Sequence, residues 1–190
     1  QPDEDPEGRI PPGQYLTKKF PVLTKGPTPT VDLDRWRLRL FGNVTEEVVF
    51  SWEEFSELPR VTITTDFHCV TRWSLLDCTW EGVHIRDVVA RVEVLSSTRY
   101  VMVHGYGQYT TNLPVADLID EDVLFAHSWN GEPLSKNHGG PIRLVVPKLY
   151  AWKSTKWVNG LEFLTHNQRG YWDQAGYHDR GDPWKEERFS

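Results

Sequence analysis

The strongest constraint on the fold is the hydrophobic pattern, which alternates with a period of two in many short segments and follows helical spacing only briefly. Ser51, followed by two glutamates, is typical of the start of a short helix that ends before Pro59. Short helices among more numerous strands, with no recurring βαβ unit, predict an α+β fold with mixed, β-rich sheets. Strands are predicted at 35–40, 48–50, 61–67, 100–104, 123–126, 142–146 and 158–164, and further helices at 85–92 and 114–118.

Two turns are predicted in the middle of the chain. Residues 80–83 are predicted to form a turn that leads into the helix at 85–92, and Asn130-Gly131 is the signal of a tight hairpin turn. The strand at 61–67 is expected to deliver His68 and Cys69 at its end.

The length of 190 residues is that of one ordinary domain. Residues 1–17 are rich in proline and acidic side chains, show no periodicity, and are predicted to form a flexible N-terminal arm. Residues 18–190 are predicted to form the domain itself.

Charge and composition exclude several classes of partner. The formal net charge is −6, so no general attraction to nucleic acid or to an anionic membrane surface is expected. No apolar stretch approaches the roughly 20 residues of a membrane-spanning helix. Two cysteines are too few for a disulfide scaffold, so a cytoplasmic location is expected, or a periplasmic one if an upstream signal has been removed.

Familiar catalytic motifs are missing, which leaves two features that could carry chemistry. The sequence has no Gly-x-Ser-x-Gly elbow, no phosphate-binding Walker loop, no His-Glu-x-x-His and no zinc-ligand spacing. The first remaining feature is Cys69, whose neighbours His68 and Arg72 would favour a thiolate, a soft metal ligand. The alternative is a buried cysteine that behaves as a small hydrophobic residue, which is the commoner case.

The second feature is the segment 138–157. Gly139 and Gly140 precede Pro141 and allow the backbone to approach a ligand, and cationic or hydroxyl side chains follow within a short span. This pattern fits an anion site, and it fits a solvated basic loop equally well. The donors concerned are Arg143, Lys153, Ser154 and Lys156.

Several separated motifs together resemble the molybdopterin-binding domain of the sulfite oxidase family. The resemblance runs from about Lys18 to Tyr177, and it is closest to the stand-alone prokaryotic branch that includes the catalytic subunit of methionine sulfoxide reductase. It implies the sulfite-oxidase-type molybdopterin-binding fold and a Mo-molybdopterin cofactor. The motifs are Thr65–Trp73, Gly105-Tyr106, Tyr109–Pro114, His138–Arg143 and Lys153–Trp157.

The resemblance also implies roles for individual residues. Cys69 matches the thiolate that binds molybdenum, Tyr177 matches an active-site tyrosine, and Arg72 is the one arginine near the cysteine. The family places two arginines there in animal and plant sulfite oxidases, so sulfite is a less expected substrate. Lys18–Pro21 resembles a segment that closes over the cofactor. The expected cofactor-binding residues are His104, Gly105, His138, Arg143, Ser154, Thr155 and Lys156.

The function implied is transfer of an oxygen atom to or from a small molecule, as S- or N-oxide reduction or sulfite-like oxidation. The resemblance further implies an external electron-transfer partner, a cytochrome or other haem protein, because the sequence contains no second redox centre. Two alternatives stand beside it: a non-catalytic molybdopterin-binding module, and a ligand-binding domain that uses some of the nine tryptophans.

Overall fold

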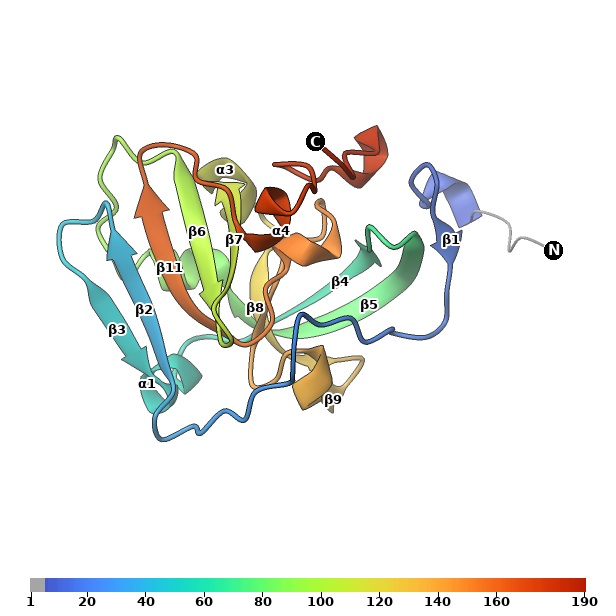
Figure 1. Cartoon of the computed structure of the whole chain (residues 1–190). Helices are drawn as coiled ribbons and strands as arrows, with labels where there is room; N and C mark the ends of the chain where they lie inside the picture. The colour runs from blue at the N-terminus through green and yellow to red at the C-terminus, as the bar shows by residue number, and fades with distance from the viewer. Residues whose placement is uncertain (1–5) are drawn as a thin grey trace.

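Two β-sheets form the body of the protein in the computed structural model, which describes residues 6–190 (Figure 1). The first sheet has the order β1-β5-β8-β10, with β4 paired to β5 and β9 paired to β8, and the second has the order β3-β2-β11-β6-β7. Most pairs are antiparallel, and β1–β5 and β2–β11 are parallel. The strands of the first sheet are β1 Tyr15–Leu16, β4 Val61–His68, β5 Trp73–His84, β8 Leu124–Trp129, β9 Glu132–Pro133 and β10 Arg143–Val145. Those of the second are β2 Arg37–Gly42, β3 Val48–Ser51, β6 Tyr100–Gly105, β7 Tyr109–Pro114 and β11 Val158–Leu164.

The helices are short and lie at the ends of strands. Ser51 caps the first of them as expected: its hydroxyl accepts from the Glu54 amide, and the Glu54 carboxylate accepts from the Ser51 amide. The α-helices are α1 Trp52–Ser56, α2 Ile85–Val89, α3 Val115–Leu118 and α4 Tyr171–Gln174. Short 3₁₀ turns are η1 Pro6–Gly8, η2 Lys136–His138, η3 Ala151–Lys153 and η4 Pro183–Lys185.

The predicted turn at residues 80–83 is wrong, because these residues lie inside the long strand β5. A Cβ atom at Gly82 would lie 1.9 Å from the carbonyl oxygen of Phe125 on the neighbouring strand β8. Glycine is therefore present here for close approach of two strands rather than for a turn. Strands β1, β7 and β9 and the first part of β5 were not predicted either.

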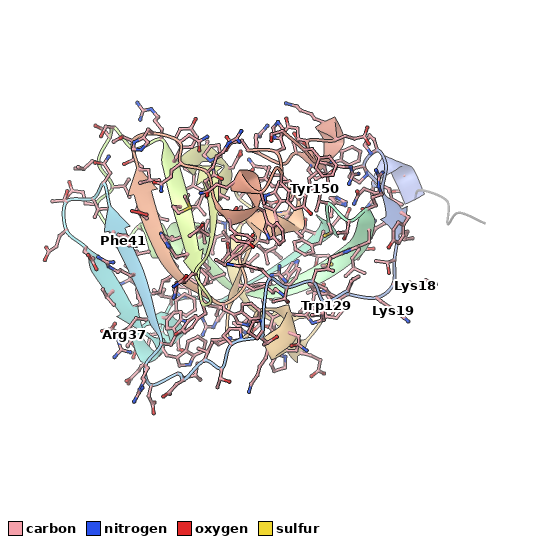
Figure 2. All side chains as sticks on the ribbon, viewed as in Figure 1. Lys18, Lys19, Arg37, Phe41, Trp129 and Tyr150 are labelled. Carbon is pink, nitrogen blue, oxygen red and sulfur yellow. The ribbon has the colours of Figure 1, made fainter. Side chains whose placement is uncertain are left out.

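The N-terminal segment is held against the first sheet from Arg9 onward, because Arg9 pairs with Asp66 of β4 and with Asp77 of β5. Residues 1–5 of the expected arm lie outside the described residues. Tyr15 and Leu16 pair in parallel with Trp73 and Ser74 of β5. The chain then runs along the sheets toward β2 (Figure 1). Figure 2 shows Lys18 and Lys19 where this segment leaves β1, and Trp129 close to its path.

Two hydrophobic clusters stabilise this arrangement. The larger includes buried side chains from both sheets, and the smaller surrounds the end of β4 with Phe67, Cys69, Trp73 and Trp80. Five of the nine tryptophans are buried, and three of these, Trp36, Trp73 and Trp80, belong to the two clusters. Within residues 6–190, no helix is long and apolar enough to cross a bilayer.

Candidate active site

A cavity of about 290 Å³ lies where the N-terminal segment, the loop after β4 and the C-terminal third of the chain meet. Its cationic lining residues are Lys25, Arg143 and Lys156, and none of the described lining residues is an aspartate or glutamate. Phe20 and Pro21 also line it, as expected for a segment that covers the site, whereas Lys18 and Lys19 do not.

Cys69 enters this cavity from a tight loop that directly follows β4. The Cys69 amide donates to the carbonyl oxygen of Trp73 at 2.9 Å, and the Arg72 amide donates back to the carbonyl oxygen of Cys69 at 3.0 Å. Cys69 is only 6% exposed, and its sulfur accepts a hydrogen bond from the Thr71 hydroxyl at 3.2 Å. The strand therefore delivers the thiol to the cavity wall, as the sequence predicted.

The prediction that His68 and Arg72 supply positive charge beside the Cys69 thiol is wrong. Burial lowers the pKa of His68 to about 4, so its imidazole is neutral near pH 7, and its Nδ1 pairs with the Ser74 hydroxyl. Arg72 does not line the cavity and donates instead to the carbonyl oxygen of Gly13. Burial raises the pKa of Cys69, and the Thr71 hydrogen bond and the Arg143 charge oppose that increase. Arg143 is thus the cation that acts on the thiol.

Arg143, which is buried, and Lys156, which is half-buried, lie side by side because an antiparallel bridge joins their residues. The Arg143 guanidinium donates to the carbonyl oxygens of His138 and Ser154, at 3.0 and 2.9 Å, and its Nε has no hydrogen-bond partner in the described chain. Lys156 Nζ donates to the carbonyl oxygens of Leu23 and Asn137, at 2.8 and 2.9 Å, and to the Thr24 hydroxyl.

Neither cation has a carboxylate partner within residues 6–190. Burial accordingly lowers the pKa of Arg143 to about 10, and burial together with the Arg143 charge lowers the pKa of Lys156 to about 7. Placing a buried and a half-buried cation side by side without a carboxylate is unfavourable unless an anion joins them. The arrangement fits an anionic ligand group and argues against a merely solvated loop.

Gly139 allows these two side chains to meet. Its φ of +113° lies in the left-handed region, and a Cβ atom there would lie 2.9 Å from Cβ of Arg143 and 3.0 Å from Cγ of Lys156. The neighbouring His138 lines the cavity, and its Nε2 pairs with the carbonyl oxygen of Phe20 at 3.0 Å. His138 therefore fastens the N-terminal segment over the site.

Another part of the cavity wall is aromatic. The Tyr177 ring lies 5.0 Å from the Trp152 ring and 5.4 Å from the Trp172 ring, centroid to centroid. The Tyr109 hydroxyl donates to the carbonyl oxygen of Trp152 at 2.5 Å, so this wall is partly fixed by its own contacts. Of these four lining residues the sequence analysis named only Tyr177 as a site residue, although Tyr109 begins one of the quoted motifs.

Three of the expected cofactor-binding residues lie outside the cavity lining. His104 pairs with Glu162 at 3.1 Å and lies against the Phe41 ring. Gly105 lies directly behind the segment that carries Lys156, since a Cβ there would be 2.6 Å from the Lys156 carbonyl oxygen. Thr155 is buried, and its hydroxyl has no partner in the described part of the chain.

Of the neighbouring residues in that segment, one lines the cavity and another is buried away from it. Ser154 lines the cavity, while its hydroxyl accepts from the Val146 amide. Lys153, one of the donors in the basic segment, is fully buried elsewhere and pairs with Asp173 at 3.2 Å.

A family model for the oxidoreductase molybdopterin-binding domain matches residues 25–172. The chain belongs to this family. It is 43% identical over 187 residues to the uncharacterized oxidoreductase YuiH of Bacillus subtilis (strain 168), a match that covers 98% of this chain and 94% of that protein.

More distant members of the family are longer proteins, and the chain matches only part of each. The chain is 26% identical over 169 residues to a putative protein-methionine-sulfoxide reductase subunit, YedZ1, of Azospira oryzae, covering 87% of this chain and 64% of that one. It is 24% identical over 203 residues to human mitochondrial sulfite oxidase, covering 88% and 37%. The chain therefore spans between about a third and two thirds of these relatives.

The fold is shared with a solved structure of the sulfane dehydrogenase SoxCD from Paracoccus pantotrophus. The TM-score is 0.69 at 22% identity, covering 83% of this chain and 46% of that one. The predicted family, mixed β-rich fold, oxidoreductase class and Mo-molybdopterin cofactor are confirmed. The cavity also fits that cofactor, because it combines a thiol with a carboxylate-free pair of cations.

Proposed function

We propose that this oxidoreductase transfers an oxygen atom to or from a small molecule at a molybdenum whose protein ligand is Cys69. The observation that carries the proposal is the shared cavity, in which the only lining thiol and two cations without carboxylate partners, Arg143 and Lys156, come together among the described residues. When bound, the cofactor supplies the oxygen-atom transfer and the two-electron redox chemistry.

The chain's own residues would hold the cofactor at two points. Cys69 would supply a thiolate to the metal, and metal binding would overcome the burial that raises its pKa. Arg143 and Lys156 would neutralise the phosphate, and Lys156 would exchange contacts with Leu23 and Thr24 for phosphate oxygens.

The scarcity of other metal-binding side chains agrees with a single protein ligand. Across residues 6–190, no group of three or more His, Cys, Asp and Glu side chains is arranged to hold a metal ion. A metal beside Cys69 would therefore take most of its ligands from the pterin and from non-protein oxygen.

The aromatic wall favours a neutral oxide over sulfite as substrate. Tyr109, Trp152 and Tyr177 offer apolar surface and phenol groups there, and Arg72 is directed away to Gly13. An anion next to this wall would lose hydration, and the cavity cations Arg143 and Lys156 are assigned to the cofactor phosphate. We therefore assign the substrate to the S-oxides or N-oxides, with electrons supplied by an external carrier such as a cytochrome.

A paired substrate assay tests this assignment. With a reduced viologen dye as donor, we expect turnover of a dialkyl sulfoxide or an amine N-oxide with kcat/KM at least about tenfold above that for sulfite with ferricyanide as acceptor. Sulfite oxidation that equals or exceeds oxide reduction would contradict the substrate class and leave the metal assignment standing. Turnover of neither, by protein with a full molybdenum content, would favour the non-catalytic module.

A further inference from the structure

Side chains from both ends of the chain hold the loop that carries Cys69. The Gln14 side-chain amide donates to the carbonyl oxygens of Cys69 and Trp73, at 3.0 and 2.9 Å. The Arg188 guanidinium donates to the carbonyl oxygen of Val70 at 2.8 Å. The two peptide groups that follow the cysteine are therefore fixed by residues that are remote in sequence.

Gln14 and Arg188 also hold each other. Arg188 donates to Oε1 of Gln14 at 2.7 Å and to the carbonyl oxygen of Pro12 at 3.1 Å. Its side chain is buried at 5% exposure, and its guanidinium lies 5.1 Å from the centre of the Tyr150 ring. Packing against this ring orients the guanidinium, so the two side chains act as one unit, which we call the terminal clamp.

The loop needs such support because its own backbone provides little. Between Cys69 and Trp73 there are two internal hydrogen bonds, and Arg72 adopts a φ of +77°, which is strained for a residue with a side chain. Loops with few hydrogen bonds open locally even when the core is stable. A metal ligand displaced by about 1 Å loses its function.

We propose that Gln14 and Arg188 are positioning residues that keep the Cys69 sulfur directed into the cavity. The proposal rests on the proposed role of Cys69 as the metal ligand. Neither residue lines the cavity, so both act through the loop backbone. The amide of Gln14 is the donor to the cysteine carbonyl, and Arg188 sets the orientation of that amide while it holds the next peptide.

Thiol labelling of the cofactor-free full chain tests the clamp without relying on activity. Iodoacetamide modification of Cys69 is followed by peptide mass spectrometry, with the fully buried Cys78 as internal reference. Gln14→Glu keeps the size and the acceptor oxygen for Arg188 but removes the amide donor; Arg188→Ala removes the guanidinium. Arg180→Ala is the matched control, because this arginine of the same C-terminal segment pairs with Asp117 instead of the loop.

We expect Cys69 labelling, relative to Cys78, to accelerate about tenfold in Gln14→Glu and in Arg188→Ala and to stay at the parent rate in Arg180→Ala. In molybdenum-loaded protein, the same two variants should weaken the visible thiolate-to-metal absorption at unchanged pterin content. Parent-like labelling of Cys69, or equal acceleration of Cys69 and Cys78, would overturn the clamp. If Arg188→Ala does not fold, Gln14→Glu decides alone, and labelling remains decisive even if the protein binds no molybdenum.

Discussion

Replacing Cys69 by serine should abolish oxygen-atom transfer while most of the pterin stays bound. Serine matches cysteine in size and keeps the loop geometry, but a hydroxyl is a hard, weakly acidic ligand where a soft thiolate is required. The organic part of the cofactor would still be held by Arg143 and Lys156, which also line the cavity. Activity with a viologen donor, together with pterin and molybdenum content, checks this outcome.

Cys78 provides the matched control. It is fully buried, does not line the cavity, and its thiol contacts only the carbonyl oxygen of Leu75 at 3.6 Å among the hydrogen bonds of the described chain. Cys78→Ala should leave molybdenum content and turnover unchanged. Full activity in Cys69→Ser would eliminate Cys69 as the ligand.

Removing either of the two cavity cations should deplete the purified protein of pterin and molybdenum. Loss of one charge from a desolvated ion pair costs about 2 to 5 kcal/mol, which corresponds to roughly 30-fold or more in cofactor affinity. We expect this depletion in Arg143→Ala and in Lys156→Ala. Lys156→Met, which keeps the aliphatic stem, separates loss of charge from loss of packing.

Lys148→Ala is the control for the cation variants. Lys148 is a partly buried lysine that already pairs with Asp117 and Asp120, at 2.9 and 2.7 Å, and it does not line the cavity. It should load with cofactor as the parent does. Equal metal and pterin content in all of these variants would show that the cations belong to a solvated basic face and not to a phosphate site.

Local sequence signals predicted those elements whose cause is itself local. The alternation in β2 and β4, the helix start at Ser51 and the Asn130-Gly131 hairpin turn all depend on residues near one another. The turn predicted at 80–83 failed because Gly82 has a long-range cause, the close approach of β8. No local pattern reveals which strand will press against a glycine.

The positions of site residues were predicted correctly only where their order in the sequence matches their arrangement in space. The end of β4 delivered Cys69, and the bridge between residues 143 and 156 placed the two cations together, as the family resemblance implied. Closeness in sequence to Cys69 gave a wrong prediction for His68 and Arg72. Burial keeps His68 neutral, and the Arg72 side chain points toward Gly13. The contacts of Gln14 and Arg188 could not be predicted, because they join segments 174 residues apart.

X-ray absorption at the molybdenum edge tests the central claim most directly, because it counts the sulfur atoms bound to the metal. The account predicts one more sulfur neighbour in the parent protein than in Cys69→Ser, with the pterin sulfurs common to both. The same number of sulfur neighbours in the two proteins, or a parent chain that binds no molybdenum when expressed with the complete cofactor, would contradict it.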